Sequence, residues 1–118
     1  MIKITTQNQI AVLSLPIEVK DRITKIMKIL EESYDRTIYH DEGGFVVVLE
    51  NIADLKKLEE YHLYVESAIP EYVEVIKSKD KQTYVETLIL LNSDFSIVII
   101  MTKEMLKLTP WKNQINNN

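Results

Sequence analysis

The sequence predicts an α+β fold with a mostly antiparallel sheet of four to six strands, two main helices and a short C-terminal helix. Three apolar, β-rich runs at 71–77, 82–91 and 95–101 are separated only by short polar turns, a pattern typical of antiparallel hairpins. Earlier in the chain, apolar residues recur at the spacing of a helix that packs one face on a sheet. The expected order of elements is (β)αββαβββα, and the hairpin-type links argue against a parallel, doubly wound sheet.

The first expected helix covers residues 16–34. Pro16 occupies a favoured first helical position, and apolar side chains from Val19 to Tyr34 recur at helical spacing with charged residues between them. Residues 4–14, before this helix, are ambiguous, and within them residues 9–13 could form a short strand. They supply the optional first strand of the predicted order.

A hairpin and a second helix are expected next. Residues 37–40 and 45–50 flank a turn that contains two glycines, which favours a hairpin. The second of these runs is apolar at its first five positions, so we expect this strand to be covered on both faces. Asn51 can then cap the second helix, with Asp54 supporting its first turn.

The boundaries of the remaining helices are predicted from the spacing of apolar residues, from capping residues and from the prolines beyond their ends. The second helix is expected to end before Pro70, and Thr102 is expected to cap a short helix that runs through Leu108 and stops at Pro110. The apolar stripe of the second helix consists of Ile52, Leu55, Leu58, His62 and Val65.

Length and composition limit the classes of function. The 118 residues suit one domain, expected over 1–112 and followed by a disordered polar tail at 113–118. The net charge is −4 and the Lys and Arg residues are scattered among acids, which disfavours nucleic acid as a partner. Cysteine is absent, which excludes thiolate catalysis and Cys-based metal sites. No apolar run is long enough to span a membrane, and we expect a cytoplasmic protein.

The two histidines are the candidates for catalysis or metal binding. His62 would share a helical face with Glu59 and Glu66, yet metal sites usually need more ligands than one helix provides. His40 lies beside Asp41 in the expected turn, where Asp is favoured for backbone reasons alone. No nucleophile, phosphate loop or complete ligand set accompanies either histidine. We therefore expect a non-enzymatic protein with no metal and no organic cofactor.

The aromatic residues are the candidates for partner binding. Tyr61, Tyr64 and Tyr72 cluster around the end of the second helix, and Trp111 lies near the C-terminus. Tyr and Trp are enriched at protein interfaces because they combine a large apolar area with a polar tip. For any single Tyr, however, a place at the edge of the core is the more common one.

These observations favour a small protein-interaction module of the inhibitor, immunity or accessory and regulatory type. We expect it to use an apolar or acidic surface and to bind another protein or a second copy of itself. The reason is that the two main helices can cover one sheet face, while the other face has only the short C-terminal helix and the N-terminal segment. If these two fall short, apolar strand residues stay exposed on that face. One alternative is a regulatory domain that senses a small molecule between helix and sheet. Another is an enzyme that uses His62 or His40 with nearby carboxylates.

Overall fold

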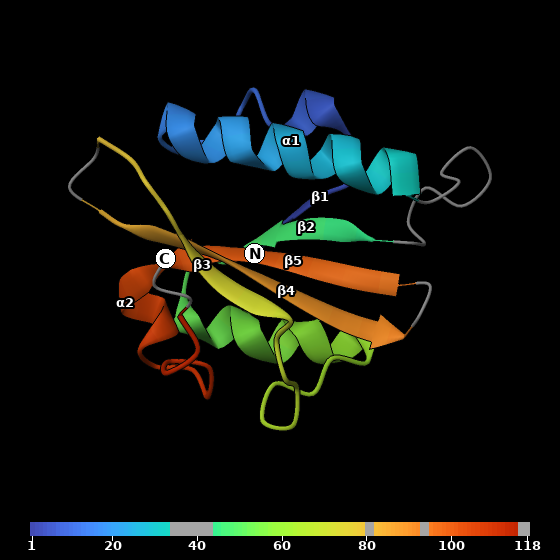
Figure 1. The fold of residues 1–118 in the computed structure, drawn as a ribbon, viewed down its shortest axis with the longest axis vertical. Coiled ribbons are helices and arrows are strands. Elements are labelled where there is room, and N and C mark those ends of the chain that lie inside the picture. Colours follow the sequence, from blue (N-terminus) through green and yellow to red (C-terminus); the bar gives the residue numbers. More distant parts are fainter. Residues whose placement is uncertain (34–43, 80–81, 93–94, 116–118) are drawn as a thin grey trace.

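A computed structural model describes residues 1–33, 44–79, 82–92 and 95–115. They form a five-stranded mixed sheet between two helical layers, which confirms the α+β class (Figure 1). In chain order the elements are β1 (Ile2–Ile4), the 3-10 turn η1 (Gln7–Gln9), α1 (Ile17–Ser33), β2 (Phe45–Val48), the 3-10 helix η2 (Ile52–Tyr61), β3 (Tyr72–Ile76), β4 (Tyr84–Asn92), β5 (Phe95–Thr102) and α2 (Lys103–Leu106).

The strand order is β1-β2-β5-β4-β3. The expected meander of three strands is present, because β3, β4 and β5 pair antiparallel to their neighbours along the chain. β2 instead lies parallel to β5, with Phe45 opposite Ile97, and antiparallel to β1. The sheet is thus antiparallel except for one internal pair, which the sequence did not reveal. The expected strand at 37–40 lies outside the described residues.

Residues 9–13 do not form the possible strand, and the strand that precedes α1 is β1 instead. Ile10 and Leu13 are both buried three positions apart, and the amide of Leu13 donates to the carbonyl of Ile10 (3.1 Å). Spacing of three is that of a turn of helix, whereas a strand buries alternate residues. The side chain of Gln9 closes the preceding turn by accepting from the amides of Thr5 and Thr6 (2.7 and 3.1 Å).

Helix α1 confirms the first predicted helix, whereas the second is shorter and tighter than predicted. η2 ends at Tyr61 because His62 adopts a left-handed conformation (φ 63°), so the stripe does not extend to His62 and Val65. Helix α2 begins as predicted, with the amide of Met105 donating to Thr102 Oγ1 (3.2 Å). It ends at Leu106 rather than Leu108.

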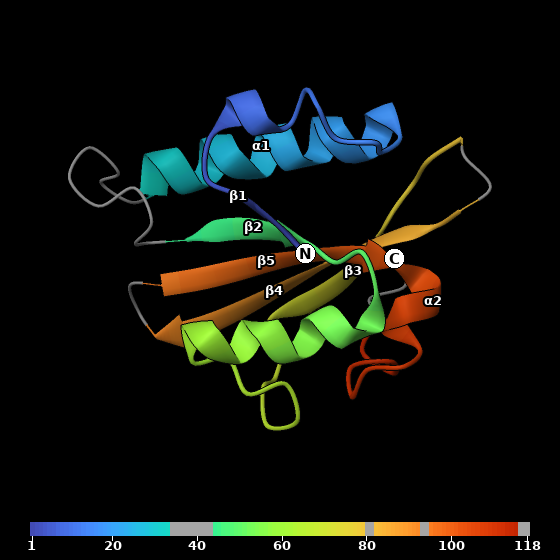
Figure 2. The same cartoon turned by 180° about the vertical axis from the view of Figure 1, so that it is seen from behind.

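The two main helices lie on opposite faces of the sheet, so the expectation that both cover one face is wrong (Figures 1 and 2). Alternate residues of β2 explain the arrangement: Val46 and Val48 join the cluster under α1, and Phe45 and Val47 join the cluster under η2. All four are buried, as the apolar run predicted. Both sheet faces therefore have a helical cover, and the uncovered face on which we had based the expectation of a partner is not found.

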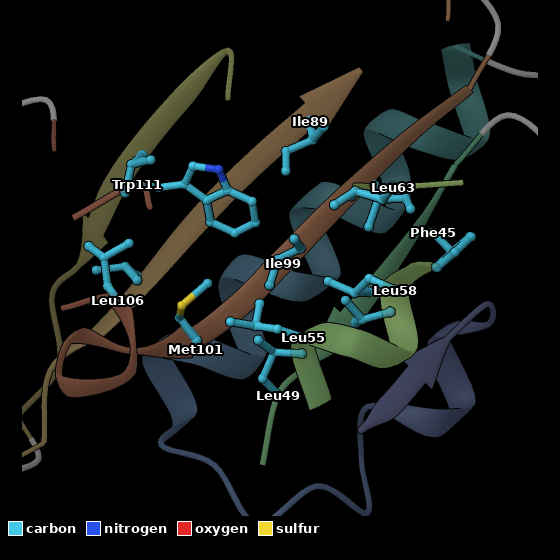
Figure 3. Close-up of a cluster of buried hydrophobic side chains, with 14 residues drawn as sticks. Phe45, Leu49, Leu55, Leu58, Leu63, Ile89, Ile99, Met101, Leu106 and Trp111 are labelled. Carbon is cyan, nitrogen blue, oxygen red and sulfur yellow. The ribbon is translucent and has the colours of Figure 1, made fainter. Parts of the chain in front are cut away.

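The cluster under η2 extends to the C-terminal segment. Figure 3 shows Trp111 and Leu106 lying with Met101 and Ile99 of β5, while Leu55 and Leu58 of η2 approach from the other end. Beyond Trp111, Ile115 forms an isolated parallel bridge with Val73 of the edge strand β3. The rest of the expected disordered tail, residues 116–118, lies outside the described residues.

Candidate functional site

A groove of about 840 Å³ lies along η2 between two segments of loop. Its floor is η2, one wall is the loop at 64–67 that follows η2, and the other wall is the segment at 108–112 that follows α2. Both loops lie on the side of the molecule away from α1 (Figures 1 and 2). The groove is lined by Ile52, Leu55, Lys56, Glu59, Tyr64, Val65, Glu66, Ser67, Leu108, Thr109, Pro110 and Lys112.

The first wall, at 64–67, is held by the turn that ends η2. The left-handed conformation of His62 reverses the chain, and the next residue, Leu63, is fully buried in the cluster under η2. The amides of Ser67 and Ala68 then both donate to the carbonyl of Tyr64 (3.1 and 2.9 Å). These bonds fix the loop as a compact turn with the Tyr64 side chain on its outer surface.

The second wall, at 108–112, is anchored by Thr109 and Trp111. Thr109 Oγ1 donates to the carbonyl of Leu106 (2.8 Å) and accepts from the amide of Trp111 (3.1 Å). The Trp111 side chain is 1% exposed, and its indole Nε1 donates to the carbonyl of Ala68 (3.1 Å). This last bond links the segment of the second wall to the residue that follows the first wall, behind the groove.

The floor of the groove is anchored at the start of η2 by Asp54, whose side chain is 1% exposed. Its carboxylate lies 2.9 Å from the amino group of Met1 and 3.1 Å from Lys57 Nζ, and it accepts from the amide of Glu50 (3.0 Å). Burial opposes the charge, but the hydrogen bonds from these donors outweigh it and hold the pKa of Asp54 well below its usual value.

The lips of the groove combine exposed apolar residues with charges. Tyr64 is 60% exposed and Leu108 is 69% exposed, one on each wall. Glu66 and Lys112 are exposed on the same two walls, and Lys56 and Glu59 on the floor. Such a lining suits the binding of an apolar side chain flanked by polar groups. No histidine is among the lining residues.

The structure places the four predicted aromatic residues in different surroundings, of which only Tyr64 is an exposed groove residue. Tyr61 is half-buried and packs edge-on against Phe45, with ring centroids 4.9 Å apart. Trp111 is a core residue that acts on the groove from behind. Tyr72 lies on the α1 side of the sheet, where its hydroxyl donates to Glu86.

The histidines form no metal site within the described part of the chain. His62 is exposed at the end of η2, and Glu66 lies beyond the helix, so the helical face expected to join them does not exist. No group of three or more His, Cys, Asp or Glu side chains suited to a metal ion occurs among the described residues. His40 lies outside them.

A partly buried ion pair on the α1 side of the sheet was not predicted from the sequence. Glu86 of β4 is 2% exposed and accepts from Arg22 Nε (2.5 Å) and Arg22 Nη2 (2.9 Å) of α1. The hydrogen bond to Glu86 raises the pKa of Arg22, and burial raises the pKa of Tyr72, so both groups keep their protons. The sequence hints at this ion pair only by placing an acid, Glu86, within the largely apolar run 82–91. Its partner could not be identified from the sequence, since Arg22 is 64 positions away. The cluster ties α1 to the edge of the sheet.

The chain matches no protein-family model, no curated protein and no solved structure. No helix among the residues described is both long and apolar enough to cross a membrane.

Proposed function

We propose that this protein is a non-enzymatic protein-binding module that receives an apolar segment of its partner in the groove along η2. The observation that supports this is the pair of exposed apolar residues, Tyr64 and Leu108, on two walls that are already joined by the bond from Trp111 to Ala68. Large apolar side chains gathered at one concave surface are typical of interaction sites. Binding of this kind would suit an inhibitor, an immunity factor or a regulatory subunit.

Preorganisation of the groove supports the proposal further. A partner that binds a fixed groove does not have to order the loops that form it, and this lowers the entropic cost of association. Here the walls are fixed by hydrogen bonds at His62, Tyr64, Thr109 and Trp111. The exposed Tyr64 side chain offers a large apolar contact with a hydroxyl that stays accessible to partner groups.

The runner-up is a small-molecule sensor that uses the same groove. The volume of about 840 Å³ lies within the range of ligand pockets, roughly 300–1,000 Å³. Against this, the groove is shallow enough to leave Tyr64 and Leu108 mostly exposed, whereas small-molecule sites usually enclose their ligand. The space between helix and sheet, where the sensor alternative places its ligand, is filled by the two apolar clusters.

The proposal is tested by comparing surface variants in a quantitative pull-down from the native host. Tyr64→Ser and Leu108→Ser should each reduce recovery of the partner about tenfold or more, as loss of an interface hot spot does. Val12→Ser is the matched control, because Val12 is 83% exposed near the start of α1 and should leave recovery unchanged. Circular dichroism confirms that each variant is folded.

Two results would contradict the proposal. Equal recovery by the folded groove variants and the Val12→Ser control would remove the groove as the binding surface. A thermal shift caused by metabolites and abolished by Tyr64→Ser, without any protein partner, would favour the small-molecule sensor instead.

A further inference from the structure

We infer that a second copy of this chain also binds at the groove, in a weak two-fold dimer in which the Leu108 wall of each copy faces the Tyr64 wall of the other. The inference rests on the proposed function, since it assigns a partner to the same groove. It also gives the groove a regulated state, because a groove occupied by a second copy is closed to other proteins.

Charge complementarity between the two walls is the first argument. Lys112 is exposed on the wall that carries Leu108, and Glu66 is exposed on the wall that carries Tyr64. Within the part of the chain that the structure describes, neither makes an ion pair. Each wall therefore presents a large exposed apolar side chain, Tyr64 or Leu108, and one unpaired charge, and the two charges are opposite.

Symmetry turns this pattern into a defined arrangement. In a two-fold dimer the rotation axis lies in the contact plane, and the same patch serves both copies. If the axis runs along the groove, each wall meets the opposite wall of the partner, so the wall with Lys112 and Leu108 meets the wall with Glu66 and Tyr64. If the axis runs across the groove, each wall meets its own copy and like charges face each other. The charges therefore favour the axis along the groove.

The size of the groove limits the strength of the dimer. Twelve residues line it, whereas stable interfaces use about 20–30 residues a side. We therefore expect a dissociable dimer rather than an obligate one. At low concentration the groove is open to a partner protein, and at high concentration two copies close each other's grooves.

Sedimentation velocity over a concentration series tests the inference, with the full chain throughout. Wild-type protein should show a reversible shift from monomer to dimer. Leu108→Asp should remove the dimer, and Val12→Asp, on an equally exposed apolar residue outside the groove, should not. A strictly monomeric wild type at about 1 mM, or a dimer that survives Leu108→Asp, would overturn the inference.

Charge reversal tests the orientation of the axis. Lys112→Glu and Glu66→Lys should each weaken the homodimer about tenfold, since every contact between walls then pairs like charges. An equimolar mixture of the two variants should form a heterodimer at least as strong as the wild-type dimer, because both contacts regain opposite charges. Lys25→Glu, on the exposed side of α1, is the control and should change nothing.

Failure of this inference is distinguishable from failure of the proposed function. If the single reversals leave the dimer unchanged, or if the mixture is no stronger than either variant alone, the two-fold contact along the groove is wrong. A monomeric protein that still loses its host partner on Tyr64→Ser would overturn the dimer while leaving the groove as the binding site.

Discussion

The two faces of the sheet are covered by different means. One face is covered mainly by α1, a single helix of 17 residues, with Ile10 and Leu13 of the preceding segment added to the same cluster. The other is covered by the ten residues of η2, the four of α2 and the loops that follow each of them. A continuous helix packs its apolar stripe without interruption, whereas short segments meet at angles and leave concave surface between them. The groove thus arises from the way the second face is covered, and the proposed binding surface needs no separate insertion.

The two covers also differ in how they are attached to the rest of the molecule. α1 is attached by apolar packing and by one buried ion pair, from Arg22 to Glu86. The second cover depends on hydrogen bonds near the ends of its short helices. The main ones run from Trp111 to Ala68 and from Glu50 to Asp54. Short helices have few internal bonds of their own, so they need such anchors. We therefore expect the second cover to be the more sensitive to single substitutions.

The largest effect is expected for Trp111→Ala. The change removes a side chain that is 1% exposed and the bond that joins the two walls of the groove. The free energy of unfolding should fall by about 4 kcal/mol in urea denaturation. Lys112→Ala, at the exposed neighbouring position, should change it by less than about 0.5 kcal/mol. A loss below about 1 kcal/mol for Trp111→Ala would mean that this cover does not depend on its C-terminal anchor.

A somewhat smaller effect is expected on the α1 side for Arg22→Met, about 3 kcal/mol, because the change leaves the buried Glu86 carboxylate without its cation and with only the hydrogen bond from Tyr72. The double variant Arg22→Met, Glu86→Leu should recover most of this loss, since no uncompensated charge remains. Urea denaturation of both variants measures the difference. If the double variant is as unstable as the single one, the loss does not come from an uncompensated charge on Glu86.

The pH dependence of stability tests the anchor at Asp54. Because the pKa of this carboxyl is lowered by folding, its contribution is complete above the unfolded value near 3.8 and is lost as the pH falls through the lower folded value. Between pH 6 and pH 2 the wild type should therefore lose about 2 kcal/mol more stability than Asp54→Asn. Chemical denaturation at each pH measures the free energy of unfolding. Equal losses of this free energy in the two proteins would show that Asp54 is not the group responsible.

The smallest effect, and one of opposite sign, is expected for Thr87→Val. Thr87 is fully buried, and its Oγ1 has no hydrogen-bond partner in the described structure. Removing this hydroxyl while keeping the shape should stabilise the protein by up to about 1 kcal/mol. Thr102→Val makes the matched comparison, because it removes the N-cap of α2 and should destabilise by about 1 kcal/mol. Thermal melts of the two variants should move in opposite directions.

Local signals in the sequence were sufficient for the elements whose structure is locally determined. The apolar run that begins at Phe45 predicted a strand buried on both faces, and Thr102 predicted the start of α2. The end of η2 was missed because it lies at His62, whereas a left-handed cap is usually Gly or Asn. His62 also fits the spacing of the apolar residues of η2. The spacing alone therefore predicted a helix that continues past Tyr61.

Contacts between distant segments were beyond the reach of pattern analysis. The groove depends on a bond between Trp111 and Ala68, which are 43 positions apart, and no periodicity links them. Tyr64 could be proposed as a surface residue from its type alone, but Leu108 could not, since an apolar residue near a helix end is usually expected to be buried. The side of the sheet on which each helix packs was equally hidden, because β2 is apolar on both faces.

The parallel pairing of β2 with β5 has a consequence for the order of folding. The strands of the meander, β3 to β5, are joined by short connections and lose little chain entropy when they pair. β2 must wait for β5, which is the last strand in the chain, and β1 in turn needs β2 as its neighbour. Substitutions such as Val85→Ala in β4 should therefore slow refolding, whereas Val46→Ala in β2 should mainly accelerate unfolding. Until the late step is complete, the open edge of β5 is exposed to pairing with other chains, so aggregation should compete with folding at that stage.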